Sequence, residues 1–226
     1  MAMSMGTNFN ETVAVDLKAW DGDYFLVMVD VATTFCQAAM IHNKRPESII
    51  HGLFSRWISL FGAPRQLLSD NGGEFNNDQV KTLADNFGIK LVCTAAESPW
   101  SNGTVERLNT ILGTSVKKIV DDVKCTPVIA LYWAVASRNA LQNNNGFSPN
   151  QLVYGFNPAT PNVFDGSLSQ LEGKSTSQVV ADNLNAMHQA RTDFLKNESN
   201  EKIRRALLHN VRSNDVEDLN NGDNVY

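Results

Sequence analysis

The chain has 226 residues, of which 42% are hydrophobic and 19% charged, and its formal net charge at pH 7 is −5. This length and composition are typical of a soluble globular protein with one domain and appendages. No apolar run reaches the ~20 residues of a membrane-spanning helix and no secretory signal precedes the first predicted strand, so we expect an intracellular protein with no membrane partner. The acidic balance disfavours strong sequence-independent binding of nucleic acid by this chain alone, because such binding needs clustered lysines and arginines.

The N-terminal part of the chain predicts three strands. Residues 11–17 form a short apolar, β-branched run that we expect to end as a strand near Asp16. A turn at residues 21–23 leads to an apolar strand over residues 24–32, and residues 35–41 predict a third strand. Because the Asp-Gly-Asp turn suits a hairpin, we expect the three strands to form an antiparallel meander.

Helices and short strands alternate after the meander. Residues 46–61 carry apolar residues at three- and four-residue spacing, with Pro46 in the first turn and Gly62 after the end, which predicts an amphipathic helix. The next predicted elements are a strand over 65–70, a helix over 76–88, a strand over 89–95, a loop over 98–103, and helices over 104–122 and 127–142. This order predicts an α/β fold in which a mixed five-stranded sheet has helices on both faces.

The C-terminal third of the chain predicts a cover for the core and a helical extension. A turn-rich segment ends the core near residue 160, and apolar positions within 177–210 predict one long helix or a helical hairpin. Two placements of this extension stay open: a coiled coil or partner helix, or a helix folded back on the core. The predicted organisation is a tail over 1–11, a core over 12–160, a linker with the helical extension over 161–212, and the start of a further unit over 213–226.

Three acidic residues carry the main functional signal: Asp16, Asp70 and Glu106. Asp70 and Glu106 have 35 residues between them. In the predicted sheet, Asp16 and Asp70 lie on neighbouring central strands, and Glu106 faces them from the following helix. Carboxylates brought together in this way repel one another and need cations to stay ionised, and a pair of Mg²⁺ ions also serves in-line phosphoryl transfer. The pattern therefore favours an enzyme that cuts or joins nucleic acid.

Two further acids leave alternatives open. Glu74, four residues after Asp70, is either a metal ligand or a solvent-facing acid near a helix start. Asp30, at the end of the second predicted strand, is either an extra carboxylate of the site or the cap of the following turn. The cysteines and histidines show no zinc-ligand spacing, so no zinc site is predicted.

Three motifs occur in order: the strand-borne Asp16, the block SDNGGEF at residues 69–75, and the block PWSNGTVERLN at residues 99–109. Through these motifs and their spacing, residues 12–160 resemble the catalytic core of retroviral and gypsy-type retrotransposon integrases and of related DDE transposases. The segment NGFSPNQLVYGFNP also resembles the part of gypsy-type enzymes that closes the core. The resemblance implies an RNase H-like fold, and it implies that residues 213–226 begin a truncated C-terminal β-barrel.

The resemblance implies a polynucleotidyl transferase with endonuclease activity, which processes the 3′ ends of an element's DNA and joins them to target DNA. The implied cofactors are two Mg²⁺ (or Mn²⁺) ions, with Asp16 bridging both and Asp70 and Glu106 each binding mainly one. The implied partners are DNA, as element ends and target, and further copies of the chain in at least a dimer. Such a reaction is expected in the nucleus, although the sequence shows no clear basic localisation run.

Residues beside the three acids are expected to contact DNA. By analogy with the family, the loop over residues 98–103 is a mobile gate. Gly72 and Gly73 either permit close approach of a DNA backbone or simply turn the chain, and both readings stay open. Retroviral relatives place basic residues that face DNA one and two turns after the glutamate, whereas this chain has Thr110 and Gly113 at those positions. The expected DNA contacts are Asn71, Gly72, Trp100, Ser101, Asn102, Asn109 and Lys117.

Two other functions stay open at this point. A domesticated protein derived from a transposable element would keep the fold as a non-catalytic DNA-binding or interaction module. Loss of one of the three acids would favour that alternative, and all three are present. A metal-dependent nuclease would use the same acids without strand transfer, but the 35-residue spacing and the helix around Glu106 favour the integrase.

Overall fold

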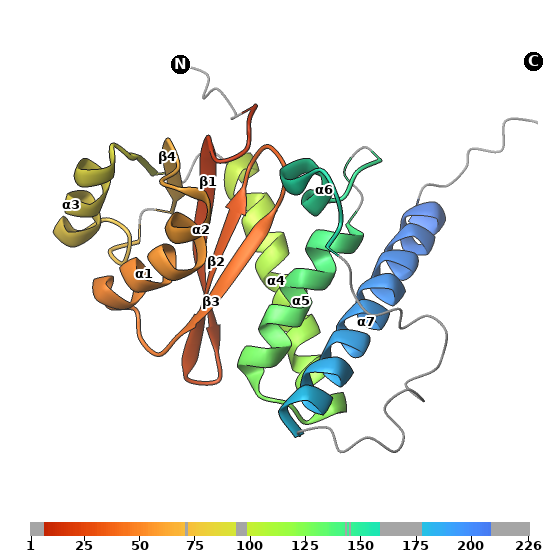
Figure 1. The fold of residues 1–226 in the computed structure, drawn as a ribbon. Coiled ribbons are helices and arrows are strands. Elements are labelled where there is room, and N and C mark those ends of the chain that lie inside the picture. The colour runs from red at the N-terminus through yellow and green to blue at the C-terminus, as the bar shows by residue number, and fades with distance from the viewer. Residues whose placement is uncertain are drawn as a thin grey trace, which may run out of the picture.

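A five-stranded mixed sheet forms the centre of the protein, and helices cover both of its faces (Figure 1). The computed structural model describes residues 7–70, 72–93, 99–142, 144, 146–158 and 178–208. The sheet has the order β3-β2-β1-β4-β5. β2 pairs antiparallel with both β1 and β3, and β4 pairs parallel with both β1 and β5. The predicted mixed sheet and its meander are therefore confirmed. The strands are β1 (Thr12–Trp20), β2 (Asp23–Asp30), β3 (Cys36–Ile41), β4 (Gln66–Ser69) and β5 (Lys90–Cys93).

The β1–β2 hairpin is longer than the sequence predicts. Asp21 and Gly22 at its tip have φ angles of 43° and 86°, and such positive angles are typical of two-residue hairpin turns. The expectation that the first strand ends near Asp16 is wrong, because its last residues pair with β2 as far as the Trp20–Asp23 pair. Asp16 therefore lies in the middle of β1, whose pairing with β2 runs from Val13 to Trp20.

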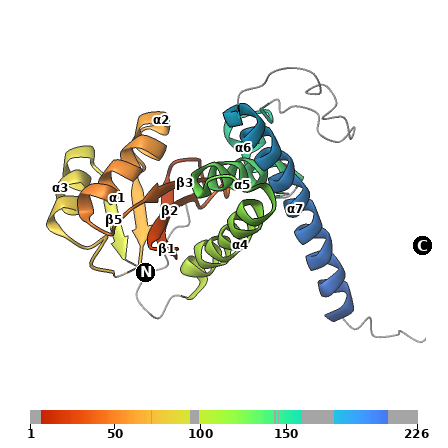
Figure 2. The same ribbon diagram turned by 90° about the horizontal axis from the view of Figure 1, so that it is seen from below.

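One face of the sheet is covered by α1 (Pro46–Leu53), η1 (Phe54–Ile58), α2 (Ser59–Phe61) and α3 (Asp78–Phe87), as Figure 2 shows. The first three together form the predicted helix over residues 46–61, which ends before Gly62 at a φ of 79°. η1 is a π-helical turn, a local widening that apolar periodicity does not reveal. Trp57 within it is buried in the apolar core on this face, so the widened turn still contributes to packing.

The opposite face is covered by α4 (Pro99–Val123) and α5 (Pro127–Leu141). The prediction of a loop over residues 98–103 is wrong from Pro99 onward, because α4 already begins there. Proline is favoured in the first helical turn, where its missing N–H has no partner to lose, and Asn102 and Gly103 are accommodated inside the helix. The face of α4 that packs against the sheet includes the buried residues Val105, Leu108, Leu112, Val116 and Ile119.

Residues 146–158, predicted as a turn-rich cover, contain the short helix α6 (Pro149–Tyr154). The side chain of Ser148 accepts a hydrogen bond from Gln151 N at 3.2 Å, and Gln151 Oε1 accepts one from Ser148 N at 2.9 Å. This reciprocal pair is a capping box, and it satisfies two backbone donors at the start of the helix. The predicted linker over 161–176 lies outside the described residues.

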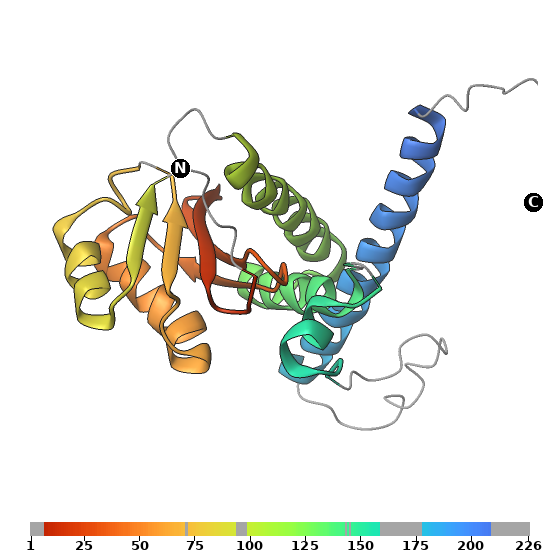
Figure 3. The same ribbon diagram turned by 90° about the horizontal axis from the view of Figure 1, so that it is seen from above.

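α7 (Gln178–Leu208) is one continuous helix that packs against α4 and α5. Its residues Ala186 and Ala190 are buried in the same core as those helices, and Trp133 Nε1 donates to Asn183 Oδ1 at 3.0 Å. The extension therefore folds back on the core, and its C-terminal part projects past α5 (Figure 3). The predicted start of a β-barrel over 213–226 lies outside the described residues. None of the helices in the described part of the chain has the length and apolarity needed to cross a membrane.

Candidate active site

Asp16 lies on the central strand β1 and faces α4. Its Oδ1 accepts a hydrogen bond from the backbone N–H of Leu17 at 2.8 Å. Its Oδ2 accepts a hydrogen bond from Asn109 Nδ2 of α4 at 2.5 Å. The carboxylate is half-buried and is held by groups from two elements, so its orientation is fixed before any ligand arrives.

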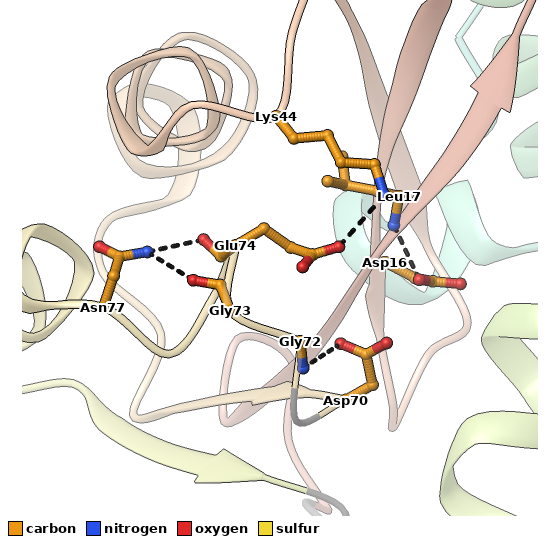
Figure 4. A network of polar contacts seen from close by, with 8 residues as sticks. All are labelled: Asp16, Leu17, Lys44, Asp70, Gly72, Gly73, Glu74 and Asn77. Carbon is orange, nitrogen blue, oxygen red and sulfur yellow. Dashed lines mark hydrogen bonds and ion pairs between the residues drawn. The ribbon is translucent and has the colours of Figure 1, made fainter.

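Asp70 follows β4 directly, beside β1. The parallel register pairs Thr12 with Gln66 and Ala14 with Leu68. Continued by two residues, this register sets Asp16 opposite Asp70, and neighbouring strands lie about 4.8 Å apart. Asp70 Oδ1 accepts a hydrogen bond from Gly72 N at 3.1 Å, which turns the carboxylate over the start of the following loop (Figure 4).

The loop after Asp70 brings a second acid to the site. A Cβ built on Gly72 would lie 3.0 Å from Asp70 Oδ1 and 2.6 Å from Glu74 Oε2, so both carboxylates flank the same glycine. Glu74 Oε1 also lies 3.5 Å from Lys44 Nζ, as Figure 4 shows. Glu74 is therefore an ion-paired neighbour of Asp70 rather than an acid that faces solvent alone. Its service as a metal ligand stays a hypothesis.

α4 contributes the third predicted acid. Glu106 lies one turn before Asn109 on the helix that packs against β1, and its neighbours Val105 and Leu108 are buried against the sheet. The side chain of Glu106 lies outside the described residues. Among the side chains that are described, no group of three acidic, histidine or cysteine residues could hold a metal ion. Asp16 and Asp70 thus form the described part of the site, and the third ligand stays a prediction.

Asn109 has a role that the sequence did not predict. It was expected to contact DNA, and in the structure it is 4% exposed and donates to Asp16. Its Oδ1 is buried and has no hydrogen-bond partner among the described residues. An unpaired buried acceptor beside the Asp16 carboxylate suits a hard cation or its water shell, which take oxygen ligands. The three-residue spacing from Glu106 was the available signal, because it places both residues on one helix face.

Of the other predicted DNA contacts, the structure places one at the site and one far from it. Lys117 is exposed on α4, about 16 Å along the helix from Glu106 at 1.5 Å per residue. Gly72 lies in the loop between the two carboxylates described above. Asn71 and the side chains of Trp100, Ser101 and Asn102 lie outside the described residues.

Asp30 is a turn cap and not part of the site. It is fully buried, and its Oδ1 accepts hydrogen bonds from Thr33 N at 2.8 Å and Thr33 Oγ1 at 2.7 Å. Its Oδ2 accepts a third hydrogen bond, from Asn10 N at 2.9 Å. Asp30 pairs with Val13, three residues before Asp16, so it lies about 10 Å along β1 from Asp16 and on the other face of the sheet. The capping alternative is confirmed.

Comparison with known sequences identifies two groups of relatives. The profile of the TnsB C-terminal domain matches residues 28–122. The chain is 27% identical over 170 residues to the Gag-Pol polyprotein of Avian reticuloendotheliosis virus. That match covers 75% of this chain and only 14% of the polyprotein.

Solved structures share the fold. The magnesium-bound, trimeric form of the HTLV-2 integrase catalytic core domain aligns with a TM-score of 0.57 and 21% identity, over 65% of this chain and 98% of that one. A chain of the simian T-cell lymphotropic virus intasome, solved in complex with a PP2A regulatory subunit, aligns with a TM-score of 0.62 and 22% identity. This match covers 71% of this chain and 62% of that one. The predicted RNase H-like fold and the resemblance to retroviral integrase cores are confirmed.

Proposed function

We propose that this chain, similar in sequence to retroviral polyproteins and in fold to integrase catalytic cores, is the catalytic core of a DDE integrase or transposase. The reaction is processing of DNA 3′ ends followed by their transfer to target DNA. One observation carries the proposal: Asp16 lies on β1, Asp70 directly follows the neighbouring strand β4, and Asp16 accepts a hydrogen bond from Asn109 of the helix that bears Glu106.

The donor atoms at the site fit divalent cations. Carboxylates of Asp16, Asp70 and Glu106 would hold two Mg²⁺ or Mn²⁺ ions, which prefer oxygen ligands. When bound, such ions activate the attacking hydroxyl and stabilise the leaving 3′-oxygen. Asn109 holds Asp16 Oδ2 in place, and the Gly72 N–H holds Asp70 Oδ1. The chain therefore supplies carboxylates whose orientation is set by neighbouring donors.

The same proposal names the partners. The substrates are element ends and target DNA, and the active form is at least a dimer, because two ends must be held together for joining. The protein then acts in the nucleus. The proposed DNA contacts are Asn71, Gly72, Trp100, Ser101, Asn102 and Lys117. Asn109 is left out because it is buried and donates to Asp16, so its proposed role is to hold that carboxylate.

A branched DNA substrate tests the proposal without knowledge of the element's end sequence. The chain is incubated with the branched duplex and Mn²⁺ or Mg²⁺, and the strands are separated by denaturing electrophoresis. We expect a 3′-hydroxyl to attack the branch point, giving one joined strand and one released strand. Glu106→Gln removes the charge and keeps the size, so it should lose roughly 10³-fold of this activity.

The control is Asp121→Asn, which removes an exposed acid from the same helix and should leave the joining rate unchanged. Cleavage without any joined strand would favour the metal-dependent nuclease. A folded chain that is inert and binds no metal ion by calorimetry would favour the domesticated, non-catalytic module.

A further inference from the structure

Lys18 lies beside the candidate active site on β1, two residues after Asp16. Residues two apart on a strand share a face, and both of these side chains face α4. Asp16 meets Asn109, and Lys18 Cε lies 3.6 Å from where a Cβ on Gly113 would stand. Asn109 and Gly113 are one helical turn apart, so the two strand residues and the two helix residues form two successive contacts between β1 and α4.

The contact with Gly113 explains how a lysine fits between the strand and the helix. Gly113 is buried, and among the residues that the structure describes Lys18 Cε is the only atom within 4 Å of its Cβ position outside its own helix backbone and chain neighbours. Lys18 is half-buried, so its alkyl stem fills the space that a larger residue at position 113 would occupy. The ammonium lies one bond beyond Cε, which is the usual way for lysine to bury its stem and keep its charge accessible.

The charge of Lys18 is not neutralised by the protein as described. Two other lysines near the sheet have acidic partners: Lys44 lies 3.5 Å from Glu74, and Lys118 lies 2.5 Å from Asp193. Among the side chains that the structure describes, Lys18 has no acidic partner and no hydrogen-bond acceptor. An accessible cation beside a cluster of carboxylates is suited to an anion that the carboxylates and their metal ions also hold.

We propose that Lys18 binds a phosphate of the DNA strand held at the acidic site, and that it supplies the positive charge that α4 lacks at Gly113. This inference rests on the proposed function. Lys18 lies about 7 Å along β1 from Asp16. Lys18 therefore meets a phosphate close to the reacting one rather than the reacting phosphate itself.

Salt-dependent DNA binding tests the inference. The probe is a fluorescein-labelled branched duplex, titrated with the full chain at fixed Ca²⁺ over a series of KCl concentrations and followed by anisotropy. Lys18→Met keeps the stem and removes the charge. We expect it to reduce the slope of log K against log[salt] by about 0.9 and to weaken binding roughly five-fold at about 0.1 M salt.

The control is Lys81→Met, which removes an exposed lysine from α3 on the opposite face of the sheet and should leave the slope unchanged. If Lys18 only packs against α4, Lys18→Met keeps the wild-type slope, and the inference is overturned. A second variant tests the charge at this place. Lys18→Arg keeps a cation there and should keep the wild-type slope; a slope as low as that of Lys18→Met would contradict the assignment.

The experiments distinguish failure of the proposed function from failure of the proposed role of Lys18. A wild-type slope in Lys18→Met with normal joining of branched DNA would remove the role of Lys18 and leave the proposed function intact. Absence of joining by the wild-type chain, with the reduced slope in Lys18→Met, would contradict the proposed function and keep Lys18 as a phosphate contact.

Discussion

Two adjacent glycines after Asp70 have different surroundings. A Cβ on Gly72 would lie 2.6 Å from Glu74 Oε2 and 3.0 Å from Asp70 Oδ1, whereas no atom of the described residues lies within 4 Å of a Cβ on Gly73. Neither glycine has a φ in the left-handed region, so alanine suits both backbones. Gly72→Ala should therefore displace the carboxylates and reduce joining of branched DNA by roughly 10- to 100-fold, because small misplacements of catalytic groups are costly.

Gly73→Ala is the matched control for this prediction. It adds the same methyl group one residue away, in open space, and should keep wild-type activity. Circular dichroism and thermal unfolding would show that both variants are folded. Equal activity in the two variants would mean that the carboxylate positions beside Gly72 do not matter for the reaction.

The residue types at the site could be predicted from the sequence, but several of their contacts could not. Asp16 and Asp70 were expected on neighbouring strands, and the parallel β1–β4 pairing confirms that placement. The Asn109–Asp16 bond joins residues 93 positions apart. Such a contact depends on how far α4 is shifted along β1, and no local pattern encodes that shift. The Lys18–Gly113 contact was missed for the same reason.

At the scale of elements, the errors concern where elements end. The apolar pattern predicted the first strand only to about Asp16, because the residues after it no longer form an apolar run. The strand nevertheless continues to Trp20, where it is still paired with β2. The helix α4 begins at Pro99 although Asn102 and Gly103 are typical of a loop. In both cases long-range packing extends an element beyond the residues whose local pattern favours it. The type and order of the strands and long helices were predicted, because each buries one regular apolar face.

The attachment of α7 includes one ion pair whose contribution can be tested. Lys118 Nζ of α4 lies 2.5 Å from Asp193 Oδ1, and Asp193 is fully buried. Gln189 Nε2 donates to the other carboxylate oxygen at 3.2 Å. Lys118→Met leaves this buried carboxylate without its cation. Because Lys118 is itself 43% exposed, we expect a modest loss of about 1–2 kcal/mol in the free energy of unfolding.

Urea unfolding measures this loss, and Lys117→Met is the matched control because that neighbouring lysine is exposed. The double variant Lys118→Met, Asp193→Leu should recover stability relative to Lys118→Met, since it removes the unpaired charge. If Lys118→Met is as stable as Lys117→Met, the ion pair does not hold α7 in place.

For the whole molecule, the sheet divides the protein into two apolar cores with different tasks. The core under α1 and α3 contains Trp57 and Ile49 and supports the sheet from behind. The core under α4, α5 and α7 fixes the helix that carries Glu106 and Asn109 against β1. Under the proposed function, cations bound at this site would reverse the local charge and let an acidic chain with a net charge of −5 act on DNA.

The central claim is that Asp16, Asp70 and Glu106 hold divalent ions jointly. Mn²⁺ binding by calorimetry tests it most directly, with the wild-type chain compared with Asp16→Asn, Asp70→Asn and Glu106→Gln. We predict that each substitution weakens or abolishes Mn²⁺ binding while thermal unfolding shows a folded chain, and that Asp30→Asn leaves the isotherm unchanged because Asp30 only caps a turn. A wild-type isotherm in Asp16→Asn and Asp70→Asn would contradict the claim.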